Sequence, residues 1–306
     1  MSRHQAETVH VGSEHRDGRS VLAAAMRALA ALALVTAVSV GCIPAPASDA
    51  NSAETSPTVI ATASPIPTAP PVPLEPSVAP TMPGYHLVFD DEFIGPKLNR
   101  KKWTTSLPWG NTNAAEQQYY TPDALSQSGG VLTITASRQP THGQPYASGV
   151  ISSGGRFAFS YGYSELRAQV PPGTGLWSAF WLLSPVQQSN EEVDVLEVLG
   201  SDPSLGFAVL HFGTNDNKGK FVGTYRNPDF SVGFHTFGLD WEPDHMIWYV
   251  DGVARYQVNQ KIPSAPLFLV TNLAVGGPDS WSGAPDKYTQ FPAQMKIDYI
   301  RVFQRN

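Results

Sequence analysis

The stretch Glu191-Glu192-Val193-Asp194-Val195-Leu196-Glu197 decides how the rest of the chain is interpreted, because it threads acids through apolar residues. Such a segment is costly to fold, since buried carboxylates need partners or must take up protons. Side chains alternate between the two faces of a regular strand. Glu192 and Asp194 would therefore share one face, and Glu197 would fall on the other.

A single extra residue would change this arrangement. A β-bulge near Val195 or Leu196 returns Glu197 to the face of the other two acids. Three carboxylates in one row then indicate acid–base or nucleophilic chemistry, or a metal site. The alternative is a solvated sheet face that carries an acid run by chance.

Composition limits the classes of protein to which the chain can belong. Its 306 residues, 42% of them hydrophobic, suffice for one large domain or two small ones. The net charge of −6 and a pI near 5.7 give no reason to expect nucleic-acid binding. The 26 glycines and 27 prolines fit a loop-rich β architecture. The single cysteine, Cys42, excludes an internal disulfide and the Cys-rich zinc sites.

Residues 1–42 predict an export signal. An apolar segment interrupted by Arg27 ends in small residues just before Cys42, which resembles a bacterial lipoprotein signal with a lipobox-like end. The segment that starts at Met26 has normal signal proportions, so Met26 is the expected true start. A non-lipidated secretory signal and a transmembrane anchor are the alternatives. In each case the protein is exported, as a cell-surface lipoprotein or a secreted protein.

Residues 43–83 consist almost wholly of Pro, Ala, Ser, Thr and Val. Such a segment cannot bury a core and behaves as a semi-rigid polyproline-type linker. With lipidation at Cys42, the linker would tether the following domain to a membrane.

Residues 84–306 have a globular composition and predict one domain built from strands. Alternating residues at 163–170 and the hairpin dipeptide Asp251-Gly252 are the clearest signs. No segment shows a long helical period with caps, so an antiparallel sandwich is expected. The expected strands are 131–136, 163–170, 206–212, 236–241, 246–250, 253–258, 267–275 and 295–303.

Two tryptophans, Trp177 and Trp181, lie just upstream of the acids. Tryptophan faces offer sugar rings a large contact area. At spacing i, i+4 on a strand the two share a face, although core packing of one of them is the alternative.

The acid motif resembles a known family. Glu192-Val-Asp194-Val-Leu-Glu197 matches the Glu-x-Asp-x-x-Glu signature of glycoside hydrolase family 16, in the bulged form of its laminarinase-like members. The similarity continues in order through residues 85–306. It implies a β-jelly roll sandwich of two curved antiparallel sheets, concanavalin-like, with a substrate cleft on the concave face. The segments that carry it are 89–93, 116–121, 161–168, 175–181, 192–197, 235–243, 248–252, 272–277 and 297–302.

The resemblance implies a retaining mechanism, which needs two carboxyls roughly 5–5.5 Å apart. Glu192 is then the nucleophile and Glu197 the general acid/base. Asp194 between them would orient Glu192 and keep the two pKa values apart. No catalytic metal or organic cofactor is implied.

Further substrate contacts follow from the same resemblance. Besides Trp177 and Trp181 it implies His211 near the acid/base, Trp281 on the cleft wall and Glu116 near the negative subsites.

Two positions depart from the laminarinase pattern. Ala115 replaces an asparagine and Val150 replaces an arginine, so two polar sugar contacts are lost. This leaves the identity of the polysaccharide open.

Family members often carry a structural calcium on the convex face. The matching positions are Glu92, the backbone at Gly130, and Asp298. Glu92 and Asp298 could equally be surface acids.

The sequence thus predicts a monomeric endo-glycosidase with a polysaccharide substrate and a membrane contact through Cys42. β-1,3-Glucan of the laminarin type, or a mixed-linkage glucan, is the expected substrate. Two alternatives stay open: a transglycosylase that remodels a cell-envelope polysaccharide, and a carbohydrate-binding protein without catalysis. Binding-only relatives lose one or both catalytic carboxylates, whereas this chain keeps all three acids.

Overall fold

The computed structural model describes residues 82–306 except 187–188, 215 and 227–228. The predictions for the signal region, Cys42 and nearly all of the linker therefore lie outside the described residues. The described chain is built from strands, with one short 3₁₀ helix, η1 (Pro122–Ala124). No helix within it has the length and apolar character needed to cross a membrane.

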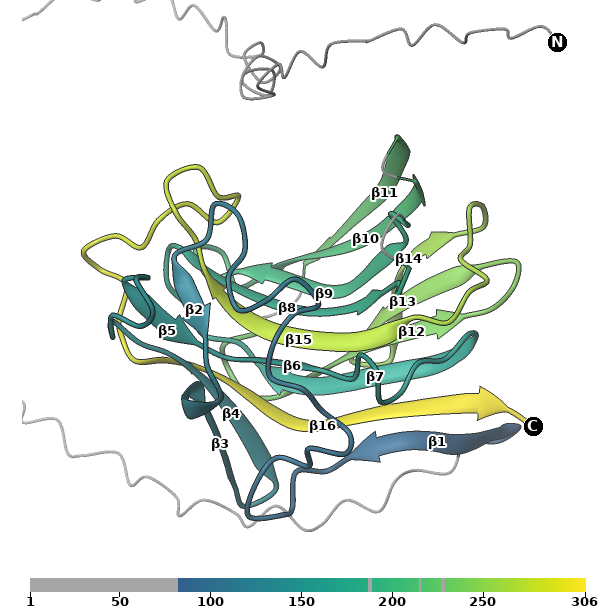
Figure 1. Cartoon of the computed structure of the whole chain (residues 1–306). Helices are drawn as coiled ribbons and strands as arrows, with labels where there is room; N and C mark the ends of the chain where they lie inside the picture. Colours follow the sequence, from purple (N-terminus) through teal and green to yellow (C-terminus); the bar gives the residue numbers. More distant parts are fainter. Residues whose placement is uncertain (1–81, 187–188, 215, 227–228) are drawn as a thin grey trace, which may run out of the picture. The chain divides into compact units, whose positions relative to one another are not determined.

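The strands form two main layers whose long strands are visibly curved (Figure 1). The eight-stranded sheet has the order β14-β13-β12-β7-β16-β4-β3, with β1 also paired to β16. Its strands are β1 (Tyr85–Asp91), β3 (Leu125–Ser128), β4 (Val131–Ala136), β7 (Gly162–Gln169), β12 (His235–Trp241), β13 (Met246–Val250), β14 (Val253–Val258) and β16 (Ala293–Arg305).

The six-stranded sheet has the order β11-β10-β9-β8-β15-β6 and is antiparallel at every pairing. A short parallel pair, β2 with β5, stands apart from both sheets. The strands are β2 (Gln118–Tyr120), β5 (Tyr146–Ser148), β6 (Val150–Ser152), β8 (Leu176–Leu183), β9 (Glu192–Leu199), β10 (Leu205–Thr214), β11 (Asn217–Arg226) and β15 (Phe268–Val275). The expected all-β sandwich is confirmed.

The strand predictions hold closely where alternation is strict. In β7 every second residue is buried, and β4, β13 and β14 have the predicted bounds. Asp251 and Gly252 both have positive φ, 50° and 72°, as the tight turn between β13 and β14 requires.

The main core lies between the two sheets. Its largest fully buried side chains include Trp103, Trp241 and Trp248. Such side chains each bury on the order of 150–250 Å² and contribute strongly to the hydrophobic stability of the sandwich. The outer face of the six-stranded sheet is not solvated throughout. A second apolar cluster covers its β15–β6 end, where Leu107, Tyr120, Val150, Phe268 and Val270 are buried together.

Strand β9 contains the expected bulge. On the β8 side Phe180 pairs with Leu196 and Trp181 with Asp194, so Val195 is the extra residue. The β10 side shows the same irregularity between Phe207 and Val209. The bulge has the predicted effect, because Glu197, which follows it, now shares a face with Glu192 and Asp194, which precede it.

Candidate active site

Three cross-strand rows place the acids on the outer face of the six-stranded sheet, hereafter the cleft face. In an antiparallel sheet, directly opposite residues point to the same face. The pairing places Glu192 between Leu183 and His211, Asp194 between Trp181 and Val209, and Glu197 between Ala179 and Phe207. Glu192, Asp194 and Glu197 thus form one acid row along β9, on an interior strand of the sheet.

A cavity of about 300 Å³ lies over the acid row, on the side of β8 and β15. All three acids line it together with tryptophan and amide side chains, a combination suited to a sugar chain. The full lining is Leu107, Trp109, Asn113, Glu116, Tyr120, Trp177, Ala179, Trp181, Glu192, Asp194, Glu197 and Asn272.

Burial raises the pKa of all three acids above that of an ordinary carboxyl. Asp194 and Glu197 are only 4% and 8% exposed. For Glu197 desolvation is the largest cause of the raised pKa, and the charges of Asp194 and Glu192 raise it further. Desolvation and the charge of Asp194 also raise the pKa of Glu192. Desolvation raises the pKa of Asp194, and the charge of Lys220 lowers it in part. Because the three carboxyls also repel one another when charged, their arrangement in one row adds to the rise of their pKa values.

His211 lies at the opposite end of the acid row from the expected one. Its Nε2 is 3.3 Å from Asp194 Oδ2 and 3.7 Å from Glu192 Oε1. The position beside Glu197 belongs to Phe207. His211 thus lies opposite Glu192, although its charge also acts on Glu197, whose pKa it lowers in part.

Both tryptophans of β8 face the cleft, and neither belongs to the core. Trp177 and Trp181 are half-buried and line the cavity. The indole N–H of Trp177 is buried and has no hydrogen-bond partner within the described chain. The same indole favours the charged form of Glu197, which offsets a small part of the rise of the Glu197 pKa. Trp281 is 49% exposed and packs edge-on against Trp177 and Phe207, with ring centroids 5.3 and 4.7 Å away. It therefore stands at the Glu197 end of the row.

Glu116 belongs to a hydrogen-bonded chain that reaches Trp181. Trp181 Nε1 donates to Asn272 Oδ1 at 2.9 Å, and Asn272 Nδ2 donates to Tyr120 Oη at 3.0 Å. Tyr120 Oη in turn donates to Glu116 Oε2 at 3.3 Å. Burial raises the pKa of Glu116, and donors such as Gln118 partly oppose this. The chain fixes the orientation of an indole and of a carboxylate on the cavity wall.

Sequence reasoning missed three residues of this wall. Trp109 is 53% exposed, and its ring centroid lies 6.3 Å from that of Trp181. Asn113 and Asn272 supply amides to the cavity. The Trp109-Gly-Asn111 sequence stood close to Glu116 and was the available signal for Trp109. Asn272 could have been suspected as the amide in an otherwise apolar strand.

The two departures from the laminarinase pattern have different structural outcomes. Ala115 adopts a φ of 61°, and the amide expected at this position comes instead from Asn113, whose Nδ2 donates to Glu116 Oε1 at 3.0 Å. Val150 is buried in the apolar cluster under the cleft, beside Tyr120. Asn113 thus brings an amide close to the position of the lost one, whereas Val150 provides only apolar contacts where the laminarinase pattern has an arginine.

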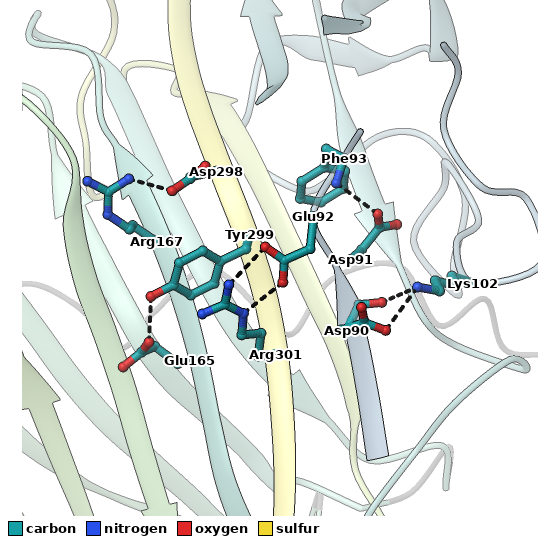
Figure 2. A network of polar contacts seen from close by, with 10 residues as sticks. All are labelled: Asp90, Asp91, Glu92, Phe93, Lys102, Glu165, Arg167, Asp298, Tyr299 and Arg301. Carbon is teal, nitrogen blue, oxygen red and sulfur yellow. Dashed lines mark hydrogen bonds and ion pairs between the residues drawn. The ribbon is translucent and has the colours of Figure 1, made fainter. Parts of the chain in front are cut away.

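Two of the suggested calcium positions are seen in Figure 2: Asp298 lies on β16, and Glu92 directly follows β1. The Glu92 carboxylate accepts two hydrogen bonds from Arg301, at 2.7 and 2.9 Å, and Asp298 forms an ion pair with Arg167. Gly130 lies beside the main chain of Glu92, where a Cβ would come 3.7 Å from the Glu92 carbonyl oxygen. Because guanidinium groups already hold both carboxylates, these side chains fit ion pairs better than a calcium shell. Calcium binding stays a prediction.

One group of side chains within the described chain has the spacing of metal ligands. Atoms of Glu192, Asp194 and His211 all lie within 4.8 Å of one another. Glu192 and Asp194 of this group also belong to the acid row, so the same side chains are candidates for acid–base chemistry.

Comparison with known proteins gives one consistent result. The family model of glycosyl hydrolases family 16 matches residues 111–301. The "Beta-glucanase" of Rhodothermus marinus is 32% identical over 254 residues, which cover 72% of this chain and 86% of that protein. "Endo-1,3-1,4-beta-glycanase ExsH" of Rhizobium meliloti is 31% identical over 241 residues. That match covers 70% of this chain and about half, 51%, of the relative.

A solved structure resembles the described strands to a similar degree. The laminarinase catalytic domain of Thermotoga maritima MSB8 has a TM-score of 0.65 and 30% sequence identity. The match covers 72% of this chain and 99% of that one. Sequence, sheet topology and the acid row agree, and the chain belongs to glycosyl hydrolases family 16.

Proposed function

We propose that the chain is a retaining endo-β-glucanase that hydrolyses internal bonds of a β-1,3-glucan or of a mixed-linkage glucan. The observation that carries the proposal is the bulge in β9, which brings Glu192, Asp194 and Glu197 to one face under a tryptophan-lined cavity. Relatives whose printed names specify endo-1,3-β or endo-1,3-1,4-β activity support the substrate class.

The geometry supports a division of labour among the acids. Glu197, buried at the end of the row beside Asp194, has a raised pKa and keeps the proton that a leaving oxygen needs. The pKa of Glu192 is also raised, to about 8, but Glu192 is more exposed than Glu197 and lies beside His211, which lowers that pKa in part. In this proposal the ionised form of Glu192 attacks the anomeric carbon. The covalent glycosyl-enzyme is then hydrolysed by water, with Glu197 now acting as the base.

Asp194 acts on the other two acids rather than on the sugar. Its charge raises the pKa of both Glu192 and Glu197. When Glu192 becomes neutral on forming the covalent bond, one negative charge leaves the row, and the pKa of Glu197 falls. That change prepares Glu197 for its second role, as base.

Product analysis with laminarin, lichenan, agarose and carrageenan tests the proposal. We expect shorter oligosaccharides from laminarin or lichenan, and a loss of at least ~10³-fold in rate for Glu192→Gln. Glu191→Gln is the matched control, because Glu191 is the adjacent acid and does not line the cavity. Activity of Glu192→Gln near that of the wild type would refute the assignment of the nucleophile.

The same experiment separates the alternatives. Oligosaccharides longer than the substrate would identify a transglycosylase. The absence of new reducing ends on every polymer would identify a binding protein without catalysis.

We also propose export, with lipidation at Cys42 and a monomeric domain. The supporting features are the apolar segment before Cys42 and the proline-rich linker after it. Wild-type protein should partition into the membrane fraction and incorporate labelled fatty acid, and Cys42→Ser should do neither. A Cys42→Ser protein that still incorporates the label would exclude lipidation at Cys42. Size-exclusion chromatography of residues 84–306 tests the monomer.

A further inference from the structure

The cleft face continues past the acid row onto β10 and β11, and there it becomes basic. The row that contains Glu192 continues through His211 to Lys220, which are directly paired across β10 and β11. Lys218 stands two residues before Lys220 and therefore points to the same face. The neighbouring row, by contrast, ends in the apolar pair Val209 and Val222.

A second cavity, of about 510 Å³, lies over this basic corner. It shares only Glu192 with the first cavity, so a glycan crossing the acid row can occupy both. Its lining is Leu183, Ser189, Asn190, Glu192, His211, Lys218, Gly219 and Lys220.

The lysines of this cavity are available for a ligand. Both are exposed, and in the described part of the chain no carboxylate lies within ion-pair distance of either ammonium group. The nearest acid along the β10–β11 turn, Asp216, forms no ion pair with Lys218. Lys220 is near enough to the acid row to lower the pKa of Asp194.

We propose that this half of the cleft binds a sugar that carries an anionic group, a sulfate ester or a carboxylate, held by Lys218 and Lys220. The proposal rests on the proposed function and adds to it an anionic group on the β-glucan that occupies this half of the cleft. Two ammonium groups form charge-assisted hydrogen bonds with such an anion, whereas the hydroxyls of a neutral glucan do not need them. They also offset the repulsion that Glu192 would exert on a bound anion.

Substrates that share one backbone test the proposal: neutral laminarin, sulfated laminarin and a carboxymethylated β-1,3-glucan. The measured quantity is the ratio of kcat/KM on each anionic substrate to that on neutral laminarin. In the double variant Lys218→Gln/Lys220→Gln we expect this ratio to fall about tenfold at low salt. The difference from wild type should shrink as ionic strength rises, since salt screens exposed charges.

The double variant Lys97→Gln/Lys101→Gln is the matched control. It removes the same two charges from exposed loop residues that line neither cavity, and it should leave the ratio unchanged. Because the control changes the net charge of −6 by the same amount, it separates a specific anion site from diffuse repulsion of a polyanion. A fall confined to the sulfated or to the carboxymethylated substrate identifies the group that is bound.

Two outcomes would overturn the proposal: a ratio that the double variant does not change, or cleavage of neutral laminarin alone by the wild type. If the wild type cleaves neither these three polymers nor lichenan, the proposed function fails, and calorimetry then decides about the site. A Glu197→Gln protein should bind sulfated laminarin oligosaccharides more tightly than neutral ones. If this preference disappears when Lys218→Gln/Lys220→Gln is added to Glu197→Gln, the anion site is supported. If Glu197→Gln shows no such preference, the anion site is refuted.

Discussion

The indole Nε1–H of Trp248 donates a 2.8 Å hydrogen bond to the main-chain oxygen of Asp194, directly beneath the acid row. Trp248 belongs to β13 of the opposite sheet and is fully buried. Asp194 immediately precedes the extra residue of the bulge, where the ladder to the neighbouring strands is irregular. The core thus supports the irregular turn of the chain that puts Glu197 on the face of Glu192.

Trp248→Phe should impair catalysis beyond its effect on folding. The substitution keeps an aromatic ring and removes the donor, at a cost of about 1–3 kcal/mol in unfolding free energy. A displaced bulge should also lower kcat about 10- to 100-fold. Thermal unfolding and steady-state kinetics measure the two effects.

Trp241→Phe is the control for that variant. Trp241 is also fully buried and donates its Nε1–H to the Pro263 carbonyl at 3.0 Å, away from the acids. It should lose similar stability and retain kcat. Equal losses of kcat in the two variants would show that Trp248 acts only through general stability.

Glu197→Gln should stabilise the protein at high pH. Because burial raises the pKa of Glu197, the folded state binds a proton more tightly than the unfolded chain does. Stability is therefore lost as pH rises above the ordinary carboxyl pKa and through the folded one. The amide removes this penalty, so the variant should melt above wild type at about pH 8 and equal to it at about pH 4. Glu191→Gln should show no such gain, and a Glu197→Gln protein that melts lower at pH 8 would contradict the prediction.

Asp194→Asn should move the pH dependence of kcat/KM toward acid. The negative charge of Asp194 raises the pKa of both Glu192 and Glu197, so its removal lowers both. The acid limb, which reports ionisation of Glu192, and the basic limb, which reports loss of the Glu197 proton, should both shift to lower pH. Limbs that stay in place while the rate falls would mean that Asp194 only orients its neighbours.

Ala115→Asn should raise the melting temperature. Ala115 has a φ of 61°, a left-handed conformation that costs an L-residue roughly 1–2 kcal/mol and that asparagine tolerates better. We expect a gain of about 0.5–1 kcal/mol in unfolding free energy. Ala114→Asn, at the exposed neighbour without a positive φ, controls for the added amide and should be neutral.

Trp109→Ala should weaken substrate binding without slowing the chemical step. Trp109 exposes half of its surface over the cavity and lies beside Trp181. Loss of one stacking face should raise KM for laminarin oligosaccharides about tenfold and leave kcat near wild type. Tyr288→Ala is the control, because Tyr288 is 72% exposed and does not line the cavity. A fall in kcat with constant KM would assign Trp109 a role in the reaction instead.

Sequence periodicity predicted the strands that have one buried and one solvated face. It located β13, β14 and their turn residue by residue, because alternation and Asp251-Gly252 agree there. It missed β11, where Lys218-Gly-Lys220 interrupts any apolar pattern. Strand β11 lies at a sheet edge, where charged residues and glycine are tolerated and burial is too slight to leave a pattern.

The acid row was predictable because one strand carries all three acids, so a local pattern contains both their spacing and the bulge. The wall of the cavity was not predictable in the same way. Asn272 lies on β15, where all eight residues are buried and the two faces cannot be told apart by hydropathy. The position of His211 opposite Glu192 was not predictable, because the pairing of β10 with β9 is a long-range property.

The position of β16 has a consequence for how the molecule is made. This strand is paired with β7, β4 and β1, and so lies inside its sheet although it is the last strand in the chain. Contacts of such large sequence separation form slowly. In a domain with many of them, the strands stay exposed until these contacts have formed. The eight-stranded sheet therefore cannot close until residues 293–305 have been made, and until then β7, β4 and β1 lack a neighbouring strand and remain accessible to chaperones.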